Sequence, residues 1–308
     1  MNLTKTKLAK AVALAVAGAA LSAGAISTAS ADGITMYNTF STASGGDLGH
    51  NSSTDGWTRT YDGTDADTIA TGPESQGNKG DIVPWVGTAG GALPFNYTGS
   101  SSLNWAAELQ SGGGALQISR ADAVAKYGTS AEIDTGAGAW QDNSAAPTGW
   151  KHQTDIGIIK SDFDGTVTLH LSRIDTPTSG IVNDNFGVTI FTGIDTHTTN
   201  YSHHGSWNCP TCATPKPFTA SDPFGTTGLA YLTHDGTVDG INGVSFHVSA
   251  GQYYTIYLGG AGVGTWSQNV SDYAMDISAV PEPASLSLFG IAYAAMAATR
   301  RRKPGQAA

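Results

Sequence analysis

The sequence predicts an all-β protein, an antiparallel β-sandwich of the jelly-roll type with long loops. Short segments that alternate apolar with polar residues recur along the chain, and turn-forming residues separate them. Gly occurs 40 times in 308 residues, and the composition is poor in helix-forming residues. Aromatic and β-branched residues are spread throughout, which argues against a disordered chain.

Residues 32–149 are the irregular part of this predicted domain. Residues 34–40 and 56–61 alternate as strands do, and long polar loops separate them from the apolar segments that follow. Residues 116–127 are the one helix-like stretch, because apolar side chains recur on one face and Gly128 can stop a helix.

Residues 150–279 are the regular part, in which the alternation is clearer. Strands are expected at residues 155–160, 166–174, 186–191, 229–233, 244–248, 253–258 and 273–277. Turns are expected at residues 162–165 and 235–236, and residues 249–252 should close a hairpin. Short strands linked by such turns favour a sandwich.

The N-terminal segment has the pattern of a signal peptide. Three lysines within residues 1–10 precede an apolar run of small residues at 11–25. Ala29 and Ala31 then fit the small-x-small cleavage pattern. Residues 1–31 are therefore predicted to be removed during export.

The C-terminal segment, residues 280–308, has three parts in a fixed order. A proline-rich motif comes first, an uncharged run second and a cluster of cations last: Pro281, Glu282 and Pro283; residues 284–299; Arg300, Arg301, Arg302 and Lys303. As a helix, the uncharged run would reach only about 24 Å, against a hydrocarbon core of about 30 Å. The cations should stay cytoplasmic. A short transmembrane helix of this kind suits a temporary anchor.

This tail resembles the PEP-CTERM sorting signal of Gram-negative bacteria. The resemblance implies that an exosortase cuts near the motif at the inner membrane. It further implies delivery to the cell surface or to the exopolysaccharide of the extracellular matrix. More loosely, residues 164–169, 187–191 and 248–254 resemble the β-sandwich ectodomains common in such proteins. Neither resemblance implies a particular reaction.

Without its two ends the chain is strongly acidic. The seven terminal cations are lost, so eight Lys and Arg remain against 25 Asp and Glu, a net charge of −17. So few cations cannot neutralise a row of phosphates, which argues against a nucleic-acid partner. Carboxylates at residues 62–67 and 162–165 could hold Ca²⁺, although neither segment matches an EF-hand loop and solvated turns are the simpler interpretation.

The only two cysteines, Cys209 and Cys212, are predicted to form a disulfide, because an exported chain folds in an oxidising compartment. The bridge would close a tiny loop, so it would fix local shape rather than stabilise the whole domain. A redox pair of the thioredoxin type is disfavoured, because nearby prolines oppose a helix after Cys212.

An alternative interpretation of the same loop is a copper or zinc site. Its ligands would be His203, His204, Cys209 and Cys212. Imidazole and thiolate suit Cu(I) and Zn²⁺. The loop also contains Trp207 and is loosely similar to sites in copper-binding surface proteins of methane-oxidising bacteria, although no motif matches residue for residue.

Seven tryptophans, all in the mature body, suggest contacts with glycan. Trp57 and Trp266 are the best candidates, because each lies among Gly, Asp or Asn residues that could bond to sugar hydroxyls around a stacked ring. The alternative is that the tryptophans are buried packing residues.

No motif predicts catalysis. Residues 133–137 resemble an aspartic-protease signature, but the second copy that this chemistry needs is missing at residues 193–197. No nucleophile elbow, zinc-protease motif or phosphate-binding loop occurs. We therefore expect a non-catalytic surface or matrix protein that requires no cofactor, with a metal-binding protein and a secreted hydrolase as alternatives.

Chemical analysis of the mature protein separates the two interpretations of the cysteine loop. Purified without chelator, the protein should be free of copper and zinc, and Cys209 and Cys212 should be linked by a disulfide. Elemental analysis and intact-mass spectrometry measure both. Stoichiometric metal that is lost in His203→Ala would instead identify a metal site.

Overall fold

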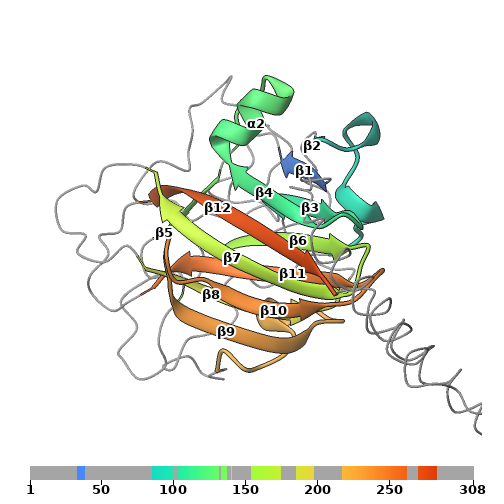
Figure 1. Cartoon of the computed structure of the whole chain (residues 1–308). Coiled ribbons are helices and arrows are strands. Elements are labelled where there is room, and N and C mark those ends of the chain that lie inside the picture. The colour runs from blue at the N-terminus through green and yellow to red at the C-terminus, as the bar shows by residue number, and fades with distance from the viewer. Residues whose placement is uncertain are drawn as a thin grey trace, which may run out of the picture.

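The structure is a computed structural model. It describes residues 33–38, 85–99, 101, 103–131, 133–136, 140, 154–174, 185–197, 217–261 and 270–282. In this part of the chain two β-sheets pack face to face, as predicted (Figure 1). The strand predicted at residues 56–61 lies outside the described residues.

The larger sheet has seven strands in the order β2-β1-β3-β6-β11-β8-β9. These are β1 (Gly33–Asn38), β2 (Trp85–Val86), β3 (Trp105–Leu109), β6 (Asp155–Ser161), β8 (Phe186–Thr192), β9 (Ala230–Val238) and β11 (Tyr253–Gly260). Neighbours run antiparallel except for β3 and β6, which are parallel.

The smaller sheet has the order β10-β7-β12-β4, and β5 also pairs with β12. These are β4 (Gly114–Ser119), β5 (Asp134–Gly136), β7 (Gly165–Arg173), β10 (Val244–Val248) and β12 (Val270–Pro281). At 12 residues, β12 is the longest described strand. It lies between β7 and β4, so both of its edges are bonded.

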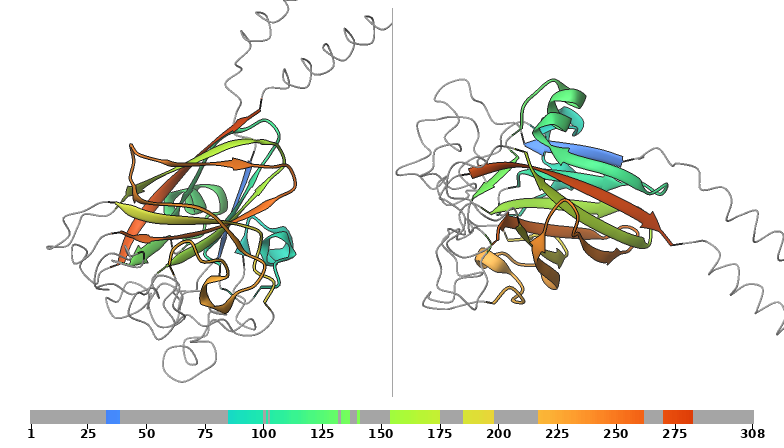
Figure 2. Two further views of the ribbon diagram at one scale, coloured as in Figure 1. Left: turned by 90° about the horizontal axis from the view of Figure 1, so that it is seen from below. Right: turned by 60° about the vertical axis from the view of Figure 1, so that its left-hand side comes forward.

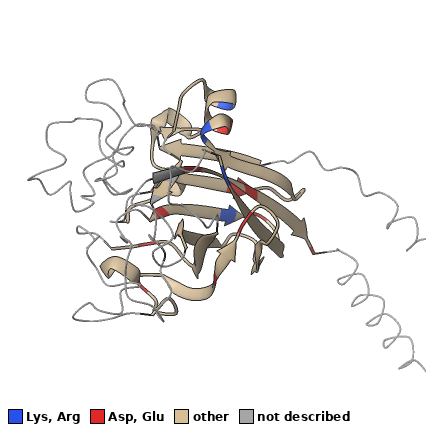
Figure 3. Cartoon of the chain, turned by 90° about the vertical axis from the view of Figure 1, so that its left-hand side faces the viewer, with Lys and Arg blue, Asp and Glu red and all other residues tan. Residues whose placement is uncertain are grey.

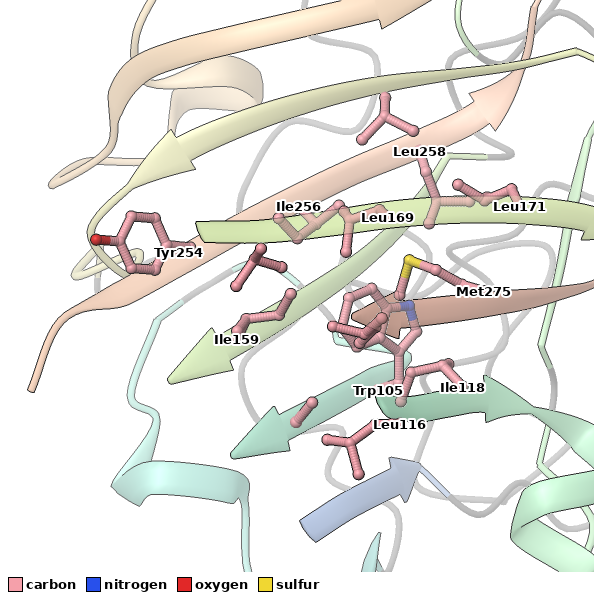
Figure 4. Close-up of a cluster of buried hydrophobic side chains, with 14 of the residues drawn as sticks. Trp105, Leu116, Ile118, Ile159, Leu169, Leu171, Tyr254, Ile256, Leu258 and Met275 are labelled. Atoms are coloured by element: carbon pink, nitrogen blue, oxygen red, sulfur yellow. The ribbon is translucent and has the colours of Figure 1, made fainter. Parts of the chain in front are cut away.

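The space between the sheets is filled by apolar side chains. On β7, Val167, Leu169 and Leu171 have no exposed surface, whereas the residues between them point to solvent. Met275 of β12 and Trp105 of β3 belong to the same cluster (Figure 4). The alternation that predicted these strands therefore arises because each strand has one apolar face toward the core and one polar face toward solvent.

The central strands of the larger sheet, β3, β6, β11 and β8, are buried on both faces. A second apolar cluster covers the outer face of this sheet, where Ile158 and Tyr257 contact residues of the segments 93–103 and 218–229. Strands covered on both sides read as continuous apolar runs rather than as alternating ones. The β-branched residues of β6 and β8 still marked these two as strands, whereas β3, with the sequence Trp-Ala-Ala-Glu-Leu, has none and was not predicted.

The predicted helix at residues 116–127 is only partly correct. Residues 114–119 are strand β4, and the helix α2 begins at Arg120 and ends at Tyr127. Leu116 and Ile118 point into the core and pair with β12, so tertiary packing overrides helical periodicity there. Ser119 caps the helix by accepting a hydrogen bond from the amide of Asp122 at 3.0 Å.

The turn predicted at residues 235–236 is also wrong. Both residues lie within β9, and the chain turns later, where Asp239 accepts hydrogen bonds from the amides of Ile241 and Asn242. Gly236 is needed for packing instead, because a Cβ there would lie 2.5 Å from the ring of Trp140.

Shortening Leu169 should destabilise the sandwich far more than shortening its outward-facing neighbour. Leu169→Ala removes a fully buried side chain and should cost about 2–5 kcal/mol of unfolding free energy. Thr166→Ala, on the exposed face of the same strand, should cost less than about 1 kcal/mol. Urea denaturation of the mature protein measures both, and equal losses would contradict the assigned faces.

Candidate functional site

The proline-rich motif begins inside the fold. β12 continues to Pro281, two residues past the predicted end of the sandwich at residue 279, and Pro281 lies opposite Gly165 of β7. Glu282 then donates its backbone N–H to the carbonyl oxygen of Asp164, at 2.8 Å. Proline has no N–H to continue a ladder, which fits its place at the end of a strand. Pro283 lies outside the described residues.

Two glycines make room for Pro281. A Cβ on Gly113, in the turn before β4, would lie 2.4 Å from the Cδ of Pro281. A Cβ on Gly165 would lie 2.4 Å from the carbonyl oxygen of Val280 and 2.9 Å from the Cα of Pro281. Any other side chain at either position would therefore push the end of β12 away. We call Gly113, Gly165 and the space between them the glycine slot.

A third turn completes this end of the sandwich. The Oδ1 of Asp164 accepts a hydrogen bond from the amide of Ala250 at 3.1 Å, which ties the β6–β7 turn to the β10–β11 turn. His247 of β10 places its Nδ1 3.7 Å from the Oε1 of Glu282. Both side chains are about half exposed, so water screens this pair and the backbone bonds carry the junction.

The charge at this end is negative. Among the described Lys and Arg residues, Lys160 is the one at this end. The ammonium of Lys160 donates a hydrogen bond to Glu108 and lies 3.2 Å from the Oδ1 of Asp162. The hydrogen bond to Glu108 raises the pKa of Lys160, so the ammonium stays charged and engaged. Within the described residues, the other cations are Arg120, Lys126 and Arg173 (Figure 3).

The start of β1 lies at the same end. Gly33 pairs with Leu109, and the carbonyl of Leu109 accepts a hydrogen bond from the amide of Asp162, next to the motif. Figure 2 shows the first residue of β1 and the last of β12 on the same side of the sandwich. We call this the tail end, and the opposite side, where β12 begins at Val270, the far end.

Comparison of the sequence with protein families identifies the segment that begins at the end of β12. Residues 279–303 match the PEP-CTERM protein-sorting motif. The chain carries an exosortase sorting signal. The predicted sorting signal is thereby confirmed, and the match includes Pro281, Glu282 and Pro283. Within the described ranges no helix is long and apolar enough to cross a membrane, and residues 284–303 lie outside those ranges.

Other comparisons add little about the body of this PEP-CTERM protein. No curated protein matches it. One similar solved structure is a surface-associated copper-binding protein, CorA, important in copper acquisition by Methylomicrobium album BG8. It shares 13% identity, over 48% of this chain and 92% of that one, with a TM-score of 0.30. A likeness this low does not bear on ligand or function.

The outer face of the smaller sheet is polar. This polar face comprises Gln117, Thr166, Thr168, His170, Ser245, Asp276 and Ser278, all exposed or half-buried. Asp276 lies opposite His170 on one side and Gln117 on the other, and it accepts a hydrogen bond from the Nε2 of Gln117 at 2.8 Å. The exposed Val280 lies on the same side of β12, and the donors and acceptors around it can bond to sugar hydroxyls.

Asp195, which follows β8, holds three segments together beside the outer cluster of the larger sheet. Its buried carboxylate accepts hydrogen bonds from the amides of Ser101 at 2.9 Å, His197 at 2.9 Å and Thr227 at 3.1 Å. This residue belongs to the degenerate second copy of the protease-like motif. Its carboxylate is engaged by backbone donors and serves the fold.

The predicted metal and disulfide residues are not placed by the structure. His203, His204, Cys209 and Cys212 lie outside the described residues, in the connection that leaves after His197, so both interpretations stay predictions. Among the residues that are described, no group of three His, Cys, Asp or Glu could hold a metal ion. Of the two acidic segments, residues 162–165 form the turn at the junction and residues 62–67 are not described.

Some of the tryptophans are described by the structure and others are not. Trp85, Trp105 and Trp140 are 3%, 0% and 5% exposed and are packing residues. Trp140 stacks on Phe218 with ring centroids 4.0 Å apart, and its Nε1 donates to the hydroxyl of Thr189. The two predicted glycan contacts, Trp57 and Trp266, lie outside the described residues, as do the predicted cleavage residues Ala29 and Ala31.

Sequence reasoning missed the partners of the motif. Gly113, Asp164 and His247 surround Pro281 and Glu282, yet they come from turns and strands far apart in the chain. The Asp164-Gly165 pair was the one available signal, and it indicated a turn without indicating what that turn contacts.

Removing the carboxylate of Asp195 should loosen the three segments that it joins. Asp195→Ala leaves three backbone donors without their acceptor and should cost about 2–5 kcal/mol of unfolding free energy. Asp195→Asn keeps one acceptor oxygen and should cost less. Urea denaturation measures the order of the two losses, and an equal, small loss in both variants would contradict the role of this carboxylate.

Proposed function

We propose that this protein is a non-catalytic surface protein that an exosortase processes and that then associates with exopolysaccharide around a Gram-negative cell. The sorting motif at residues 279–303 implies recognition by an exosortase at the membrane and export to the cell surface. Association with exopolysaccharide and the absence of catalysis are the further steps of the proposal.

The observation that carries the proposal is the continuity of the motif with β12. Pro281 is paired with Gly165 at the end of the two central strands of the smaller sheet, so no linker separates the sorting signal from the domain. What the signal delivers is therefore the folded sandwich itself, held against the membrane by its own last strand until the tail is cut.

The polar face supports contact with glycan. Hydroxyl, amide and imidazole groups project from three neighbouring strands, as in the row His170, Asp276 and Gln117. The body is acidic, so it would repel an anionic polymer unless cations bridge the two. We therefore expect a neutral polysaccharide, or an acidic one bridged by Ca²⁺. Trp57 and Trp266 remain the proposed stacking residues.

The engagement of the buried carboxylates supports a non-catalytic role. Asp155 accepts a hydrogen bond from the hydroxyl of Tyr273 at 3.0 Å, and that hydroxyl also accepts one from the Nε1 of Trp105. Burial raises the pKa of the Tyr273 hydroxyl well above its ordinary value, so it remains a donor at physiological pH. Together with Asp195, these groups join strands and loops rather than face a substrate.

Retention on immobilised exopolysaccharide tests the proposal. The mature protein should be retained by polymer from a producing strain, and Trp57→Ala with Trp266→Ala should weaken binding about tenfold, which corresponds to about 1.4 kcal/mol. Asp276→Ala tests the polar face in the same assay.

Val124→Ala, on helix α2, is the matched control and should bind as the unaltered protein does. Absence of retention by every cell-derived glycan would contradict the proposed partner.

A further inference from the structure

We propose that the folded sandwich sets the point at which the tail is cut. The exosortase cleaves on the C-terminal side of Glu282, and the mature protein keeps Pro281 and Glu282 as the end of its sheet. This inference rests on the proposed function, because it requires that the tail is processed.

The pairing of β12 is the first argument. A peptidase binds the chain to be cut in an extended form, through backbone groups that must be free to bond to the enzyme. The backbone of β12 is paired with β4 as far as Ala279 and with β7 as far as Pro281, and the amide of Glu282 is bonded to Asp164. The strand is thus paired on both edges as far as Ala279 and on one edge as far as Pro281, and the amide of Glu282 adds the last bond.

The glycine slot is the second argument. Pro281 is enclosed between Gly113 and Gly165, and both glycines are buried. Lifting Pro281 out would also expose Ala279, which is only 6% exposed. Cleavage before Glu282 therefore requires the central strand of the smaller sheet to open, whereas cleavage after it leaves the described sheet intact.

The cut has a consequence for charge. Hydrolysis adds water across one peptide bond, leaving a carboxylate on the domain and an ammonium on the departing tail. The new carboxylate joins an end that already carries Asp162, Asp164 and Glu282, while Lys160 is engaged by Glu108. The cut domain presents a negative end and loses the four cations of its tail, so anionic lipid headgroups would not hold it.

The mass of the natively processed protein tests the inference. The full chain is produced in a Gram-negative bacterium that has an exosortase, and the mature protein is recovered from the surface or the medium. Intact-mass spectrometry with fragmentation should give one C-terminus, at Glu282 or later. A C-terminus before Glu282 would overturn the inference.

A variant that leaves the motif unchanged tests the role of the sheet. In Gly165→Ala the new Cβ collides with the backbone of Val280 and Pro281, so the end of β12 should detach and the C-terminus should become ragged, with products that end between Ser278 and Pro281. Gly240→Ala is the matched control, because a Cβ there meets only the movable Oγ of Ser172. It should be cut as the unaltered protein is.

Hydrogen exchange at the amide of Val280 shows whether the strand end has opened in Gly165→Ala. An opened end together with an unchanged cleavage point would show that the sheet does not set it. If Gly165→Ala fails to fold, the C-terminus of the unaltered protein still decides the inference. A tail that is never cut, with residues 284–308 retained, would contradict the proposed function itself, whereas a cut before Glu282 would contradict only this inference.

Discussion

The pairing of β12 on both edges is the constraint on which the rest of the structure depends. This strand joins β4, from the first half of the chain, to β7, from the second, and no other described strand spans 12 residues. Its inward side chains, such as Met275 and Ile277, lie in the main apolar cluster. Because the sorting motif starts on the same strand, the stability of the sandwich and the presentation of its signal depend on one set of hydrogen bonds.

The two sheets differ in what their outer faces do. The larger sheet is covered on its outer face by loops, which Asp195 ties together through backbone amides. The smaller sheet leaves its outer face polar, with residues such as Thr166 and Asp276 exposed. The outer surface of one sheet is therefore covered by packing, and the hydrogen-bonding groups on the outer surface of the other stay in contact with solvent. The proposed glycan contact follows from this division.

The sequence predicted the strands of the second half of the chain, including β6 and β8, which are buried on both faces, and it missed β2, β3 and β5. β7, β10 and β11 were placed within two or three residues, because alternation or a hairpin turn marked them. β3 was missed because it has neither alternation nor a β-branched residue, and β4 was read as part of a helix because Ile118 also fits the helical spacing of Ala121 and Val124. The sorting signal was visible because it is local in sequence. The glycine slot was not, because Gly113 and Gly165 meet Pro281 only in three dimensions.

The position of the chain ends has a consequence for how such a protein can vary. The turns at the tail end are short, and Gly113, Asp164 and Ala250 within them make specific contacts. The longer connections, among them residues 141–153 and 262–269, leave from and return to strands at the far end, where β12 begins. Lengthening or replacing a connection there would leave the attachment of the tail untouched. Related proteins could therefore differ in the connections at the far end, and so in the surface exposed to their surroundings, while the strand end that carries the sorting motif stays the same.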